Sequence, residues 1–217
     1  MKDLLDQFFE SYELDIADYN VSVEKLKDNN NSLEKKFPGI DSAIIKYLKT
    51  GNAVELADEL INNLGIEFIV KEEFPEMPRE ANQAKEYLTT KIKNIFPGML
   101  DIFKDIVNNK TISIIRYIYV DDFKNVNFSK PGKFWTALKY KDYSWYEEHV
   151  VDNEENLYME LIAKVPGSAC SLSNSLFYAM EYSVADEELR EYEVNVKDQS
   201  KIKIYSARFK DNFEYVV

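Results

Sequence analysis

Several residue types are scarce in this 217-residue chain, and each scarcity excludes a class of protein. Cys170 is the only cysteine, so no intrachain disulfide can form and a reducing compartment is the natural setting. Positive charge is in deficit, with a formal net charge of −12. This balance disfavours nucleic acid and anionic membranes as partners, because phosphate contacts need clustered Lys and Arg. We therefore expect neither kind of partner.

Long apolar runs and metal-ligand clusters are missing as well. No segment approaches the roughly 18 apolar residues of a membrane span. The opening residues MKDLLD lack the basic stretch and apolar run of a signal peptide, so we expect none. We expect a soluble protein that is cytoplasmic where it is made, or that is delivered into a host or target cell. His149 is the only histidine and has no partners at metal-ligand spacing, so no metal is expected.

The chain does contain regularly spaced apolar residues, and their spacing changes near residue 110. Before that point apolar residues recur at the spacing of one helical face, and glycine or proline marks the ends of the segments. This pattern predicts helices around Leu4–Phe9, around Ile44–Leu48 (N-cap at Asp41 or Ser42, end at Gly51), and over Val54–Leu64, Ala81–Ile95 and Met99–Val107, with a loop over Lys71–Glu80.

After residue 110 the pattern favours strands, because β-branched and aromatic residues dominate short segments. Strands are predicted over Ile112–Val120, Phe134–Leu138 and Leu157–Val165, a hairpin over Leu189–Val196 and Ile202–Tyr205, a further strand over Phe209–Val217, and a helix over Tyr140–Val150. The fold class is therefore α+β. A helical N-terminal region, residues 1–108, packs on a mixed, mainly antiparallel sheet formed by residues 109–217, and together they make one compact domain.

Two features of the second half suggest chemistry. Arg116 lies in the middle of an otherwise apolar strand, where a charge is costly unless a partner or ligand compensates it. Glu191 and Glu193 are separated by one residue, so a strand would place both carboxylates on one face, about 7 Å apart. A guanidinium suits a pyrophosphate, and a carboxylate can stabilise an oxocarbenium-like ribose. Cleavage of the nicotinamide–ribose bond of NAD needs both groups.

The motifs around these residues resemble one family. The segment EYEVNVKDQSKIKI, residues 191–204 read from Glu191, is similar to the Glu-x-Glu…Ser-Lys ending of bacterial toxin mono-ADP-ribosyltransferases. LIAKVPGSA (161–169) resembles that family's Val-Pro-x-Gly-Ser strand end, and FWTAL (134–138) falls at its Ser-Thr-Ser motif. Arg116 falls at its NAD-binding arginine. The nearest groups are the vegetative insecticidal proteins and the enzymatic components of actin-modifying binary toxins.

The resemblance implies an ADP-ribosyltransferase-type fold, NAD as the substrate that supplies ADP-ribose, and a role for each site residue. Glu193 would be the catalytic glutamate, and Glu191 would assist the acceptor, which in this family goes with modification of arginine side chains. The protein target would meet the loop over residues 177–190. The remaining implied contacts are Arg116, Trp135 and Thr136 with NAD, and exposed Phe177, Tyr178 and Tyr182 with the target.

The sequence departs from this family at one motif and leaves two other functions open. Trp135 and Ala137 stand where the motif has its two serines, and only Thr136 is retained. The main expectation is a mono-ADP-ribosyltransferase that acts as a bacterial or phage toxin or effector. One alternative is a binding module that keeps the fold without the chemistry and sequesters a partner. The other is an NAD glycohydrolase, which would use water as acceptor at the same site.

Overall fold

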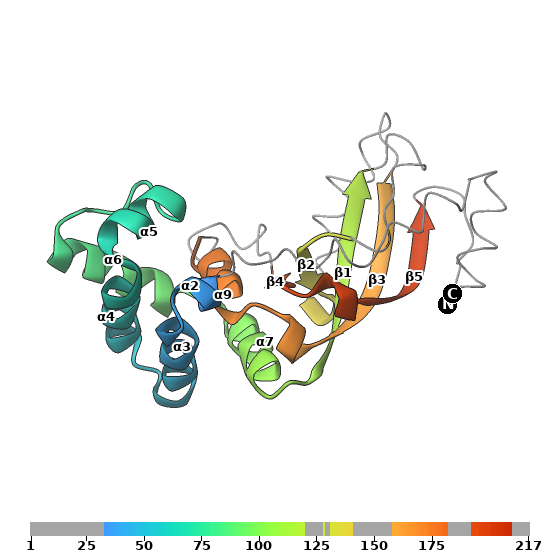
Figure 1. Cartoon of the computed structure of the whole chain (residues 1–217), viewed down its shortest axis with the longest axis horizontal. Helices are drawn as coiled ribbons and strands as arrows, with labels where there is room; N and C mark the ends of the chain where they lie inside the picture. Colours follow the sequence, from blue (N-terminus) through green and yellow to red (C-terminus); the bar gives the residue numbers. More distant parts are fainter. Residues whose placement is uncertain (1–32, 120–127, 129–130, 141–157, 182–191, 210–217) are drawn as a thin grey trace.

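The computed structural model describes residues 33–119, 128, 131–140, 158–181 and 192–209. Most of the helices lie at one end of the molecule and the strands at the other, with α7 and α9 between them (Figure 1). The predicted helices around Leu4–Phe9 and over Tyr140–Val150, and the predicted strand over Phe209–Val217, lie outside the described residues except for Tyr140 and Phe209. The described part is α+β, as the change in apolar period predicts.

Six helices precede the first strand in the described part of the chain, and their apolar faces form one core. They are α2 (Leu33–Lys36), α3 (Gly39–Thr50), α4 (Ala53–Leu64), α5 (Ile66–Glu72), α6 (Ala81–Lys93) and α7 (Pro97–Val107). Gly51 ends α3 in the left-handed conformation (φ 68°), and its N–H donates to the carbonyl of Tyr47. The side chain of Asn52 then caps α4 by accepting from the N–H of Glu55 at 3.2 Å.

Two helix boundaries differ from the prediction. The helix α3 follows Pro38, so the expected N-cap at Asp41 or Ser42 is wrong, because proline fixes a φ that already suits a helix start. The helix α5 extends into the segment Lys71–Glu80 that was expected to be a loop, and it ends at Glu72. Its buried Ile69 and Val70 are too few to produce a recognisable periodic stripe.

The strands form one open sheet in which every described pair is antiparallel, so the expectation of a mixed sheet is wrong for the described residues. The strands are β1 (Thr111–Tyr119), β2 (Phe134–Ala137), β3 (Tyr158–Pro166), β4 (Glu193–Asn195) and β5 (Lys203–Phe209), in the order β4-β2-β1-β3-β5. The long central strands β1 and β3 pair along their whole length, which makes this ladder the rigid centre of the sheet.

The predicted hairpin does not form. The strand β4 pairs with β2 at one edge of the sheet, whereas β5 pairs with β3 at the other edge. The chain between them contains the short 3₁₀-helix η9 (Gln199–Lys201), which Asp198 caps by accepting from the N–H of Ser200 at 3.1 Å. The polar residues 197–200 look like a hairpin turn, but tertiary pairing of β4 with β2 overrides that local signal.

The helix α9 (Leu172–Glu181) connects the two halves of the molecule. It comes from the strand-rich half of the sequence, yet it contacts α2, α3, α6 and α7 as well as β4. One cluster of buried apolar side chains therefore runs from the helices into the sheet. The division into residues 1–108 and 109–217 stays a prediction.

Candidate active site

Glu193 and Thr136 lie side by side on one face of the sheet. They are directly opposite each other in the antiparallel ladder of β4 and β2, and paired residues project on the same face. Phe134 projects on this face too, since it is two residues before Thr136. Glu193 is 8% exposed, Thr136 is half-buried, and Phe134 is 43% exposed. The site is therefore open to solvent beside Phe134 and closed at Glu193.

Arg116 lies where β1 and β2 part. The ladder between these strands covers Ile114 and Ile115 only, and Arg116 is the next residue along β1. Its Nη1 donates to the carbonyl oxygen of Phe134 at 3.2 Å. Arg116 thus has a hydrogen-bond partner within the protein, and compensation of its charge by a partner or a ligand stays a prediction.

The guanidinium of Arg116 and the carboxylate of Glu193 interact electrostatically. Burial lowers the pKa of Arg116 below its ordinary value, and the negative charge of Glu193 opposes this shift. A guanidinium stays protonated at neutral pH despite such a shift. Arg116, Thr136 and Glu193, which the sequence places up to 77 residues apart, lie on three neighbouring strands, β1, β2 and β4. Because Ile115 is the partner of Thr136, the Arg116 side chain starts from the opposite face of the sheet, and its relation to Glu193 is electrostatic. Glu191 lies outside the described residues.

Trp135 is placed differently from the expectation. It is 1% exposed, and its indole N–H donates to the carbonyl oxygen of Gly132 at 2.9 Å. Because strand residues alternate between faces, Trp135 projects away from the face that carries Thr136 and Glu193. The expectation that Trp135 contacts NAD directly is therefore wrong for this structure, since the ring offers almost no surface to a ligand.

Gly132 and Gln199 belong to the surroundings of Arg116, although sequence reasoning gave neither a role. Gly132 has φ +99°, and a Cβ placed on it would lie 1.8 Å from Nη1 of Arg116. Its N–H donates to Oε1 of Gln199 at 3.0 Å. Gly132 is visible in the sequence as a possible sign of such a contact, because glycine is favoured where another group lies close against the backbone. No sequence signal connects residue 132 with residue 199.

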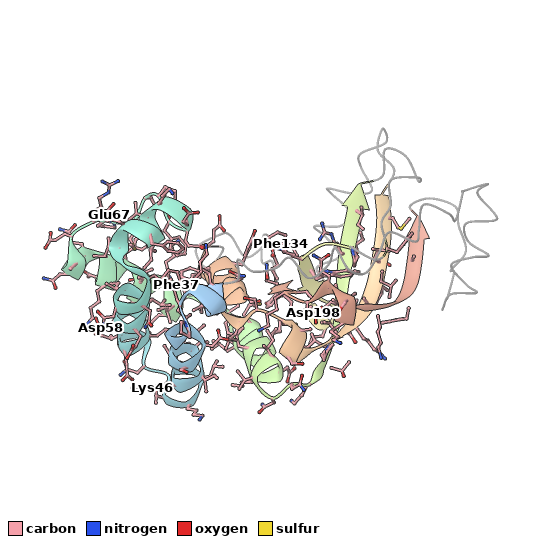
Figure 2. The ribbon with its side chains drawn as sticks, viewed as in Figure 1. Phe37, Lys46, Asp58, Glu67, Phe134 and Asp198 are labelled. Atoms are coloured by element: carbon pink, nitrogen blue, oxygen red, sulfur yellow. The ribbon has the colours of Figure 1, made fainter. Side chains whose placement is uncertain are left out.

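The described part of the segment expected to meet a protein target, residues 177–181, belongs to α9. Phe177 is 2% exposed and contacts the ring of Phe74 at a centroid distance of 6.0 Å, so its expected exposure is wrong. Tyr178 is half-buried, and the centroid of its ring lies 5.1 Å from that of Phe134. Phe134 is labelled in Figure 2. Tyr182 lies outside the described residues.

The hydroxyl of Ser175 in α9 and the backbone N–H of Ser171, just before that helix, hold β4 in place. The N–H of Asn195 donates to Oγ of Ser175 at 3.0 Å, and the N–H of Ser171 donates to the carbonyl of Asn195 at 2.7 Å. Both serines are fully buried, where a hydrogen bond is costly to lose. The short strand that carries Glu193 is thus fixed two residues beyond it.

The single cysteine and the side chains that could bind a metal are the other candidates for chemistry in the described residues. Cys170 is buried, and burial raises the pKa of its thiol to about 12, so the thiol stays protonated near neutral pH. Within the described residues, no three His, Cys, Asp or Glu side chains gather as metal ligands would. None of the helices in that part of the chain has the length and apolar character needed to cross a membrane.

Comparisons with protein-family models, with curated proteins and with solved structures each find no match.

Proposed function

We propose that this protein is a mono-ADP-ribosyltransferase that cleaves NAD and transfers ADP-ribose to a protein, and that its α+β fold is of the ADP-ribosyltransferase type. The observation that carries the proposal is the placement of Arg116 within electrostatic reach of Glu193, with Thr136 directly opposite Glu193. These are three residues that the motif resemblance assigns to one site. The chain would act as a toxin or effector, and the resemblance suggests an arginine side chain as acceptor.

The chemistry needs one anion and one cation in these positions. When the bond between the ribose C1′ and nicotinamide breaks, nicotinamide leaves with the electron pair and the ribose becomes oxocarbenium-like. The carboxylate of Glu193 would stabilise that positive charge, and its burial would strengthen the interaction. The guanidinium of Arg116 would hold the pyrophosphate, and the Thr136 hydroxyl would bind the ribose. An acceptor nitrogen then bonds to C1′ and loses a proton, with Glu191 as the expected base.

Nicotinamide release and transfer of labelled ADP-ribose to lysate proteins test the proposal. We expect turnover by the wild-type chain and a loss of at least about a hundredfold in Glu193→Gln, which keeps the shape of the side chain and removes its charge. Arg116→Lys should raise KM for NAD, because an ammonium cannot form the paired contacts of a guanidinium. The exposed residues Glu67 and Arg79 supply matched controls, Glu67→Gln and Arg79→Lys. Undiminished turnover in Glu193→Gln would exclude the assigned role.

A binding module that sequesters a partner is the second candidate. The observation that favours it is Trp135, which stands where the resembling motif has a serine and is buried away from the site face. Titration with NAD in a thermal-unfolding assay separates the two, because a ligand that binds the folded state raises the unfolding temperature. The enzyme should show a saturable rise, and a binding module without NAD affinity should show none at millimolar NAD. Nicotinamide release without protein labelling would instead indicate an NAD glycohydrolase.

A further inference from the structure

We propose that Trp135 and Gln199 are positioning residues that hold the guanidinium of Arg116 through the backbone of Gly132. This inference rests on the proposed function for its catalytic meaning, because Arg116 matters there as the group that would bind the pyrophosphate. Neither residue needs to contact NAD. Trp135 acts from inside the core, and Gln199 acts from η9, in the connection between the two edges of the sheet.

Both polar groups of the Gly132 backbone are held by side chains. Oε1 of Gln199 accepts from its N–H at 3.0 Å, and Nε1 of Trp135 donates to its carbonyl oxygen at 2.9 Å. Glycine has the widest choice of backbone conformations, so a glycine at φ +99° needs such bonds to stay in one of them. The two side chains come from different elements, β2 and η9, one buried and one half-buried, and together they fix the turn before β2.

The guanidinium lies directly against this fixed turn. The absent Cβ of Gly132 would overlap Nη1 of Arg116, so only glycine leaves room for the guanidinium at this place. Directly after this turn, at the first residue of β2, the carbonyl oxygen of Phe134 accepts the hydrogen bond from Nη1. If the turn moves, both the space for the guanidinium and its acceptor move with it. The position of Arg116 relative to Glu193 is therefore set by Trp135 and Gln199.

The anchors of Gln199 are independent of the site. The N–H groups of Lys197 and Asp198 donate to the carbonyl of Ala169, at 2.9 and 3.1 Å. Asp198, labelled in Figure 2, also accepts from the hydroxyl of Ser200 at 2.6 Å. The 3₁₀-helix η9 is thus fixed by its own contacts, and Gln199 extends from it to Gly132. A change confined to the Gln199 side chain should leave this helix intact.

Arginine-detected NMR tests positioning without any substrate. The chain has four arginines, Arg79, Arg116, Arg190 and Arg208, and Arg116→Lys identifies the signal of interest. We expect slow rotation of the Arg116 guanidinium in the wild type. Rotation should become faster in Trp135→Phe, which removes the indole N–H together with part of the buried ring, and in Gln199→Met, which removes the acceptor. Gln199→Glu keeps an acceptor oxygen and should restore the wild-type signal. Gln83→Met, at an exposed glutamine, is the matched control.

Steady-state kinetics with NAD is the second readout. Loosening a group that binds the pyrophosphate should raise KM about three- to tenfold in Trp135→Phe and Gln199→Met and leave kcat within about twofold. A merely structural role would lower kcat in proportion to the folded fraction and leave KM unchanged. Unchanged guanidinium rotation in both variants, or a fall in kcat alone, would overturn the proposal. Absence of NAD turnover in the wild-type chain would contradict the proposed function. The NMR comparison would then still decide whether Trp135 and Gln199 position Arg116.

Discussion

Glu73 offers a quantitative prediction because its carboxyl is held in unfavourable surroundings. Burial, then the negative charges of Glu181 and Glu72, raises its pKa from 4.5 to about 7. Glu73 follows the last residue of α5, and Glu181 is the last residue of α9. The next residue, Phe74, contacts Phe177 of α9, so the carboxyl is held near that helix. Replacing Glu73 with Gln should relieve the repulsion.

The sign and size of the effect follow from proton linkage. Below about pH 4.5 the carboxyl is protonated in both the folded and the unfolded chain, so it imposes no penalty. As the pH rises towards 7 the unfolded chain ionises first, and the folded state loses stability until both are ionised. A rise from 4.5 to about 7 corresponds to at most about 3 kcal/mol. Because the side chain is only partly buried and solvent screens it, we expect about 1–2 kcal/mol.

Urea denaturation at two pH values measures this difference. Glu73→Gln should be more stable than the wild type by about 1–2 kcal/mol at pH 8, and by only a few tenths of a kcal/mol near pH 4.5. Glu67→Gln, at an exposed position of α5, controls for the general loss of negative charge. Equal stability differences at both pH values would refute the reasoning, since a pH-independent effect cannot come from ionisation of this carboxyl.

Two further predictions concern packing. A Cβ on Gly167 would lie 2.5 Å from the carbonyl oxygen of Ile106, so Gly167→Ala should lower the free energy of unfolding by about 1–3 kcal/mol in urea denaturation. Wild-type stability in that variant would show that the end of α7 can shift freely. Cys170 should resist a maleimide reagent at pH 8 in the folded chain and react quickly in urea, because burial raises its pKa to about 12. Rapid labelling of the folded chain would contradict its buried position.

The sequence predicts those elements whose local pattern agrees with their tertiary surroundings. In α4 the buried residues Leu56, Ala57 and Leu60 repeat at helical spacing, between the Asn52 cap and Gly65. In the same way the apolar, β-branched stretch of β1 agrees with its central place in the sheet. Boundaries and end caps are less certain from sequence, because several polar residues near a helix start can serve as caps.

The helix α9 shows why other elements escape prediction. Buried residues occupy nearly its whole circumference, so it lacks the polar face that makes a helix recognisable. Ser175 in its first two turns and Ser171 just before it, residues that usually indicate loops, are used here to bond the backbone of β4. The same burial explains why Phe177 is not available to a partner. A segment that packs on every side carries a pattern that only the tertiary structure explains.

The candidate site shows the same limit at the level of single residues. The sequence could indicate Arg116 and Glu193, because a lone charge in an apolar strand and a paired acidic motif are visible without a structure. It could not indicate Gln199, since the expected hairpin would place that residue in an exposed turn. The pairing of β4 and β5 with opposite edges instead takes the connection across the sheet, past Ala169, and brings Gln199 to Gly132. The error in topology and the missed residue thus have one cause: a three-residue strand pairs with β2, far away in sequence, rather than with its neighbour.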